Sequence, residues 1–124
     1  MTEHDRIKKR YQELITQSLN YFPEPNETLN APTSQGVYVI RKGNSVLHVG
    51  RTLRGRYGLK QRLQNHLEKK GSSFTIKYLK MNGAALRKKI YTYQYLAVKG
   101  DRERALLEAY TIGVLCPKHI GLGV

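Results

Sequence analysis

The sequence has a single cysteine, few acidic residues and no long apolar run. The lone Cys116 excludes an intramolecular disulfide framework and a zinc site built from cysteines. No apolar run approaches the roughly 20 residues that a membrane span requires, so we expect no membrane-spanning helix. The first residues are polar and charged, without the apolar segment of a secretory signal. Together these absences predict a cytoplasmic protein.

The scarcity of acidic residues leaves a large excess of positive charge. Only 9 Asp and Glu residues oppose 22 Lys and Arg residues, so the formal net charge is +13 and the pI is near 10.0. The 124 residues suffice for one compact domain with one core. Such a charge on a small domain is typical of nucleic-acid binders, although an anionic membrane or an acidic partner would also attract it.

The first 35 residues have the pattern of a helix followed by a linker. Apolar residues recur at helical spacing between residues 3 and 20, at Ile7, Tyr11, Leu14, Ile15 and Leu19. Three prolines within 21–35 predict an irregular linker. We interpret residues 1–35 as a helical arm that packs on the core or on nucleic acid, or that joins two copies of the chain in a homodimer.

Residues 36–124 have the pattern of one α+β domain. Strands are predicted at 36–41, 46–50 and 89–98, and helices at 59–70, 74 to about 80, and 102–115. The segment after residue 74 also alternates like a strand. We therefore expect a small antiparallel sheet of about three strands, flanked by helices.

One charged residue stands out in the last predicted helix. Between Ala105 and Cys116 only Glu108 is charged, and apolar side chains cover most of the helix circumference. A carboxylate at the edge of a buried helix loses hydration, which a cationic side chain or a metal ion must offset. Glu108 is therefore either an ion-pair partner or a ligand of a divalent cation, and a single hard carboxylate suits magnesium.

Two further groups of polar residues are candidates for a site. Arg62 and His66 lie four residues apart, on one stripe of the helix predicted at 59–70. They can bind a phosphate and transfer a proton, or simply form a solvated helix flank. A basic cluster near the start of this helix either contacts phosphates or is solvated; it comprises Arg51, Arg54, Arg56 and Lys60.

In chain order these elements resemble the GIY-YIG nuclease superfamily over residues 36–120. The corresponding residues are Gly36-Val37-Tyr38, His48-Val49-Gly50, Arg51-Thr52, Arg62 with His66, and Glu108. The resemblance implies an endonuclease that hydrolyses DNA phosphodiester bonds. It implies that Tyr38 is the general base, that Arg62 neutralises the scissile phosphate, and that His66 hydrogen-bonds to the phosphate or the attacking oxygen. Glu108 would hold one Mg²⁺ or Mn²⁺ per active site.

The sequence departs from this family at two positions. His48 replaces the second tyrosine and can share or take over the role of base. Ile120 stands where an asparagine is usual, and His119 is the nearest substitute donor. These departures support two alternatives, an inactive nucleic-acid-binding module with the same fold and a basic protein bound to structured RNA.

The predicted hairpin permits a geometric test of the site. Tyr38 and His48 share a face only if the numbers of paired residues sum to an even value, which needs a connection of three or five residues. A two-residue turn at Gly43-Asn44 would place them on opposite faces. We predict an odd-length connection, with Gly43 or Asn44 at positive φ.

Overall fold

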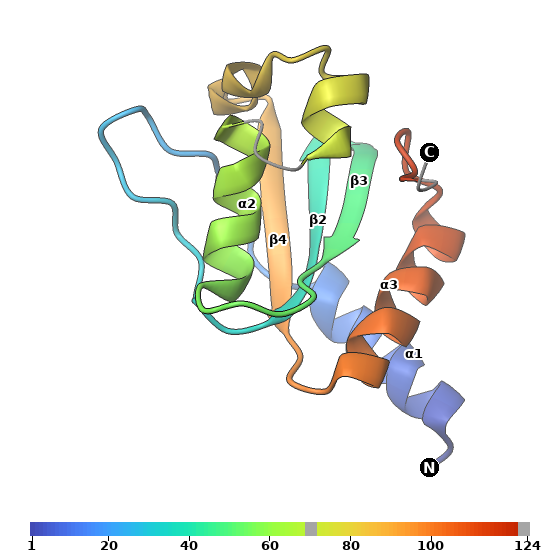
Figure 1. Ribbon diagram of the computed structural model, residues 1–124. Helices are drawn as coiled ribbons and strands as arrows, with labels where there is room; N and C mark the ends of the chain where they lie inside the picture. Colours follow the sequence, from blue (N-terminus) through green and yellow to red (C-terminus); the bar gives the residue numbers. More distant parts are fainter. Residues whose placement is uncertain (69–71, 122–124) are drawn as a thin grey trace.

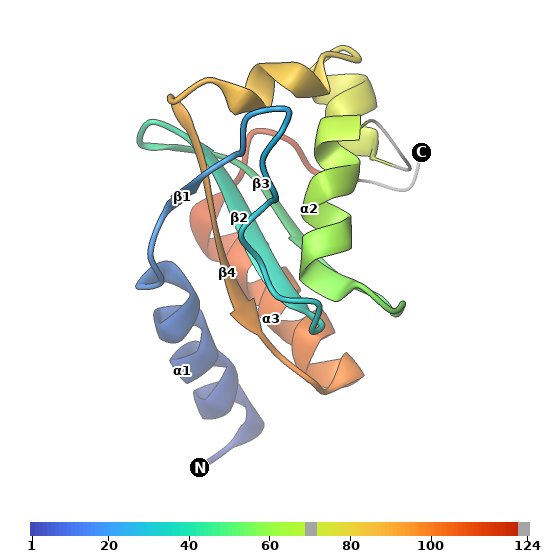
Figure 2. The ribbon, with the colours of Figure 1, turned by 90° about the vertical axis from the view of Figure 1, so that its left-hand side faces the viewer.

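The computed structural model describes residues 1–68 and 72–121. Its regular elements, in chain order, are α1 (Glu3–Ile15), β1 (Asn20–Tyr21), β2 (Gly36–Lys42), β3 (Ser45–Arg51), α2 (Gly58–Glu68), a π-helical turn (Phe74–Tyr78), a 3₁₀ turn (Gly83–Arg87), β4 (Tyr91–Ala97) and α3 (Asp101–Leu115). The strands form one antiparallel sheet in the order β1-β4-β2-β3, so the α+β class is confirmed (Figures 1 and 2).

The sheet has four strands, where about three were predicted. The additional strand is β1, which pairs with β4 through Asn20–Tyr93 and Tyr21–Thr92. Two residues are too short for the alternating pattern that identifies a strand in a sequence. The helix predicted over 3–20 therefore ends at Ile15, and the chain continues into the edge of the sheet.

Alternate side chains of the strands enter two different cores. Val37 and Val39 pack with α1 and α3 on one face, whereas Tyr38 and Ile40 pack with the leucines of α2 on the other. Figures 1 and 2 show α2 on one side of the sheet and α1 with α3 on the opposite side. The sheet thus separates two layers, and the layer beneath α2 holds the buried side chains of Tyr38, His48 and His66.

The apolar face of helix α1 packs against the rest of the chain. Its buried residues are Ile7, Tyr11 and Leu14, and ion pairs join Arg10 to Glu103 (2.9 Å) and Arg102 to Glu3 (2.8 Å) across α1 and α3. Because the apolar stripe is already covered, the structure does not support the expected homodimer contact through this helix. No helix of the described residues is long and apolar enough to cross a membrane.

The β2–β3 turn differs from the predicted one, but Tyr38 and His48 still share a face of the sheet. Lys42 pairs with Ser45, so the turn has two residues, Gly43 and Asn44, with Gly43 at φ +58°. The predicted odd-length connection is therefore wrong. However, the pairing shifts from Arg41–Val46 to Ile40–His48, which leaves Leu47 as the extra residue of a β-bulge. Beyond this bulge Tyr38 and His48 do share a face, with ring centroids 5.9 Å apart.

Candidate active site

A tyrosine–histidine contact lies at the centre of the polar layer beneath α2. Tyr38 Oη is 2.6 Å from His66 Nε2, and both side chains are fully buried. Gly50 lies opposite Tyr38 in the hairpin, where a Cβ atom would come within 2.4 Å of the phenolic oxygen. The glycine is therefore needed for the tyrosine ring to cross β3.

Two hydroxyl residues fix the hydrogen-bonding state of His66. The His66 carbonyl can only accept a hydrogen bond, so Thr75 Oγ1 must donate its proton to it (2.5 Å). Thr75 Oγ1 then has no proton for Ser72, and it accepts the proton of the Ser72 hydroxyl instead (3.0 Å). With its proton used, Ser72 Oγ accepts from the Thr75 amide (3.0 Å) and from His66 Nδ1–H (2.6 Å). Neutral His66 thus carries its proton on Nδ1, and the lone pair of Nε2 accepts the hydroxyl proton of Tyr38.

Burial holds both members of this pair in their neutral forms. It raises the pKa of Tyr38 to about 12, against the opposing charge and hydrogen bond of Arg62. Burial, followed by the nearby His48 and Arg62, lowers the pKa of His66 well below its usual value. The pair is therefore a phenol and a neutral imidazole near pH 7, and the guanidinium of Arg62 acts on both groups.

His48 lies in the same layer, beside the backbone of His119. Its ring stacks on Phe74 at 4.8 Å, and neither ring nitrogen has a hydrogen-bond partner in the described part of the chain. Burial, then the neighbouring His119 and Arg62, lowers the pKa of His48 to about 3. His119 is held beside it because the His119 amide donates to the Leu47 carbonyl at 2.8 Å.

Glu108 has an ion-pair partner, which is one of the two roles expected for it. Arg51 Nη1 is 2.5 Å from Glu108 Oε1, and the side chains are 33% and 20% exposed, respectively. Glu108 also raises the pKa of Tyr38 through its charge, so it faces the same site. The pair joins the end of β3 to α3 across 57 positions of the sequence.

The donor set at Glu108 fits a magnesium ion that keeps most of its water. No group of three or more His, Cys, Asp or Glu side chains within residues 1–68 and 72–121 can enclose a metal ion. The Glu108 side chain is 20% exposed, so its carboxylate is accessible to a cation. Magnesium is commonly bound by one or two carboxylates, with waters and substrate phosphates as its other ligands.

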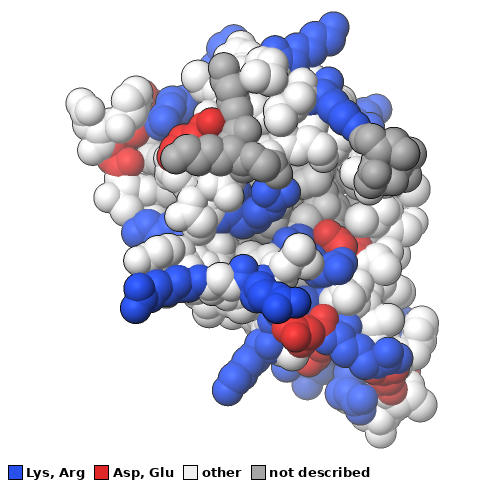
Figure 3. Space-filling view, viewed as in Figure 1, with Lys and Arg blue, Asp and Glu red and all other residues white. Residues whose placement is uncertain are grey.

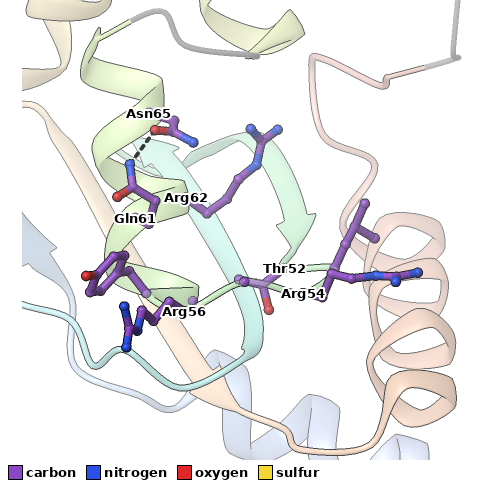
Figure 4. Close-up of a pocket in the computed structure, with 10 residues that line it drawn as sticks. Thr52, Arg54, Arg56, Gln61, Arg62 and Asn65 are labelled. Carbon is purple, nitrogen blue, oxygen red and sulfur yellow. Dashed lines mark hydrogen bonds between the residues drawn. The ribbon is translucent and has the colours of Figure 1, made fainter.

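The basic residues predicted near α2 do not all have the same surroundings. Figure 3 shows Lys and Arg side chains in a band across this face of the molecule. Arg54, Arg56 and Arg62 line a cavity beside the start of α2 (Figure 4). Lys60 lies on α2 outside this lining, and Arg51 points instead to Glu108.

The structure thus brings Tyr38, His48, His66 and Arg62 together, with Glu108 within electrostatic reach. The sequence analysis did not identify Ser72, Phe74 or Thr75 as site residues. The polar pair Ser72-Ser73, close after a histidine, was the one available signal. It also missed Arg104, which is buried and binds the backbone of the loop after β3.

Comparison with known proteins supports the same fold. No protein-family model matches the sequence, and no curated protein is significantly similar to it. Among solved structures, the GIY-YIG N-terminal endonuclease domain of UvrC from Thermotoga maritima, bound to magnesium, matches with a TM-score of 0.52 and 22% identity, covering 95% of this chain and 97% of that one. A point mutant of that domain, bound to its divalent cation, matches with a TM-score of 0.53 and 20% identity, covering 95% and 96%. The chain therefore has the GIY-YIG endonuclease fold that its motifs resemble.

Proposed function

We propose that this protein is a metal-dependent endonuclease that hydrolyses phosphodiester bonds of DNA. The observation that carries the proposal is the contact of Tyr38 Oη with His66 Nε2, in which the tautomer of His66 is set by Ser72. A buried hydroxyl aligned on an imidazole lone pair is the arrangement that activates an oxygen for proton transfer. The net charge of +13 suits a polyanionic substrate.

Proton transfer would run through Tyr38 to His66. As water attacks the phosphorus atom, Tyr38 Oη accepts a proton from the water and passes its own proton to His66 Nε2. The resulting imidazolium keeps its Nδ1–H bond to Ser72. This relay avoids a free phenolate, which a pKa of about 12 makes unfavourable near neutral pH. His48 is less well placed to accept this proton, because neither of its ring nitrogens is hydrogen-bonded to Tyr38.

Arg62 would couple substrate binding to this transfer. Its guanidinium interacts with Tyr38. A phosphate that draws Arg62 toward itself would expose the phenolic oxygen to the attacking water. In the transition state the guanidinium would neutralise the charge that develops on the phosphate oxygens. Glu108 would hold the divalent cation, which when bound polarises the phosphate and stabilises the leaving oxygen.

A second candidate is a DNA-binding module without catalytic activity. The Arg51–Glu108 ion pair favours it, because this pair satisfies the carboxylate without a metal ion. The two candidates differ in the outcome of removing the charge of Glu108. An endonuclease loses cleavage while it still binds DNA, whereas a binding module shows no cleavage to lose.

The test is a nicking assay on supercoiled plasmid with Mg²⁺ or Mn²⁺, comparing the native chain with Glu108→Gln. Glu103→Gln is the matched control, because Glu103 lies on the same helix and pairs with Arg10 away from the site. We expect the native chain and Glu103→Gln to nick and Glu108→Gln to bind DNA without nicking. Cleavage by Glu108→Gln at the native rate would refute the metal-ligand role, and DNA binding without nicking by the native chain would favour the binding module.

A further inference from the structure

A cavity of about 140 Å³ lies between the loop that follows β3 and the first turns of α2 (Figure 4). Its lining comprises residues 52–58 of the loop and Gln61, Arg62 and Asn65 of the helix. Protein cavities of about 150 Å³ hold a single benzene ring. This cavity opens to the surface, so it has room for one ring of a planar base whose remainder lies outside it.

The loop that forms the cavity is fixed to the fold from both sides. Arg104 of α3 donates to the carbonyls of Thr52 (3.1 Å) and Leu53 (3.0 Å), and Gln35 donates to that of Gly55 (2.7 Å). Gly58 has φ +42°, and a Cβ there would lie 2.2 Å from the Ser34 carbonyl oxygen. A ligand would therefore meet a preformed site, without first having to order the loop.

The side chains of this site suit a nucleobase better than a bare phosphate. Tyr57 is held 53% exposed at the cavity and presents an aromatic face on which a ring can stack. Gln61 Nε2 donates to Asn65 Oδ1 at 2.7 Å, which leaves the Gln61 carbonyl oxygen as an acceptor and the Asn65 amide as a donor (Figure 4). Arg54 and Arg56 extend to opposite sides of the loop, where they can contact flanking phosphates.

We propose that this cavity binds one unpaired nucleobase next to the phosphate that is cut, an inference that rests on the proposed nuclease function. Arg62 lines the cavity and also interacts with Tyr38, so a base held there belongs to a nucleotide beside the active site. Bases of an intact duplex are stacked and paired inside the helix, and a protein pocket receives a base only after it leaves the stack. The favoured substrate is therefore DNA with an unpaired nucleotide, such as a bulge or a flap, because a paired base must first be unstacked and unpaired.

The experiment measures binding of the native chain, without divalent cations, to two duplexes labelled with 2-aminopurine. In one duplex the 2-aminopurine is an unpaired bulge, and in the other it is paired. We expect binding to the bulged duplex that is tighter by about tenfold, with a change in 2-aminopurine fluorescence that reports stacking. Tyr57→Ala should remove most of this preference, as should the double substitution Gln61→Ala with Asn65→Ala.

Matched controls separate this site from general surface effects. Tyr21→Ala removes an equally exposed tyrosine from β1, and Gln64→Ala removes an amide from α2 outside the cavity. Both should keep the preference of the native chain. Equal affinity for the two duplexes, or a preference that survives both Tyr57→Ala and the double substitution, would overturn the proposal. A cavity that binds phosphate alone would give equal affinities that fall together in Arg54→Ala and Arg56→Ala.

Cleavage is measured separately, so that the two proposals can fail independently. A preference for the bulge without nicking in Mg²⁺ would leave the base site in place and refute the nuclease. Nicking in Mg²⁺ without a preference for the bulge would support the nuclease and refute the base site.

Discussion

The hydroxyl of Tyr38 donates its proton to Nε2 of His66 across 2.6 Å, and the direction of this bond is set by Ser72 on the far side of the imidazole. A single serine thus determines which histidine nitrogen faces the tyrosine. The relationship makes Ser72 a positioning residue, because it acts on the phosphate chemistry only through His66.

Ser72→Ala should slow DNA cleavage without affecting DNA binding. Loss of the acceptor for Nδ1–H frees His66 to place its proton on Nε2, where it can no longer accept from Tyr38. We expect the single-turnover rate to fall by about 10- to 100-fold, which is part of the rate enhancement that general base catalysis provides. Ser73→Ala is the control, because Ser73 is exposed and contacts His119 instead. Equal rates for Ser72→Ala and the native chain would show that the tautomer does not matter.

The stability of the fold should decrease as the pH falls below about 6.5, the ordinary pKa of histidine. The folded-state pKa values of His48, about 3, and His66 are both lowered, so the unfolded chain binds more protons in this window. The folded state that buries these neutral histidines therefore has its full stability above about pH 6.5 and loses stability as the pH falls toward 3. Melting temperatures measured between pH 7 and 4 test this direction. A melting temperature that stays constant or rises on acidification would contradict the burial of neutral histidines.

His48→Phe should make the protein more stable and flatten its pH dependence. The substitution removes two buried ring nitrogens that have no partner in the described residues and keeps a ring to stack on Phe74. An unsatisfied buried polar group costs about 1–3 kcal/mol. Urea denaturation at pH 7 gives the change in the free energy of unfolding, and His4→Phe at the exposed N-terminus is the control. A loss of stability would indicate that His48 has a polar partner in solution.

Arg51→Gln should strengthen binding of a divalent cation at Glu108. Arg51 neutralises this carboxylate at 2.5 Å and therefore competes with the metal ion. In a partly exposed pair the expected gain in Mn²⁺ affinity is modest, about two- to tenfold at low salt. Calorimetric titration of Mn²⁺ provides the measurement, and Arg102→Gln, which breaks an exposed pair with Glu3, is the control. Weaker Mn²⁺ binding in Arg51→Gln would contradict competition.

The sequence predicted the α+β class, because β-branched runs and helical leucine spacing are local signals. The candidate residues around Tyr38 came from the resemblance to the GIY-YIG superfamily, and their catalytic roles stay predictions. It could not show that Tyr38 and His48 share a face by means of a bulge at Leu47, since bulges depend on strand pairing. Two sets of contacts join residues more than 50 positions apart, namely the Arg51–Glu108 ion pair and the hydrogen bonds from Arg104 to the loop carbonyls. Such contacts follow from the packing of α3 and leave no periodic signal in the sequence.

The central claim is that the hydroxyl of Tyr38 takes part in the hydrolysis of DNA, and its removal tests this most directly. The measurement is single-turnover nicking of supercoiled plasmid in Mg²⁺ by the native chain, Tyr38→Phe and the control Tyr95→Phe, which alters the cross-strand neighbour of Tyr38. The account predicts that Tyr38→Phe binds plasmid normally and nicks about 10²- to 10⁴-fold more slowly, whereas Tyr95→Phe retains the native rate. Nicking by Tyr38→Phe at the native rate would contradict it.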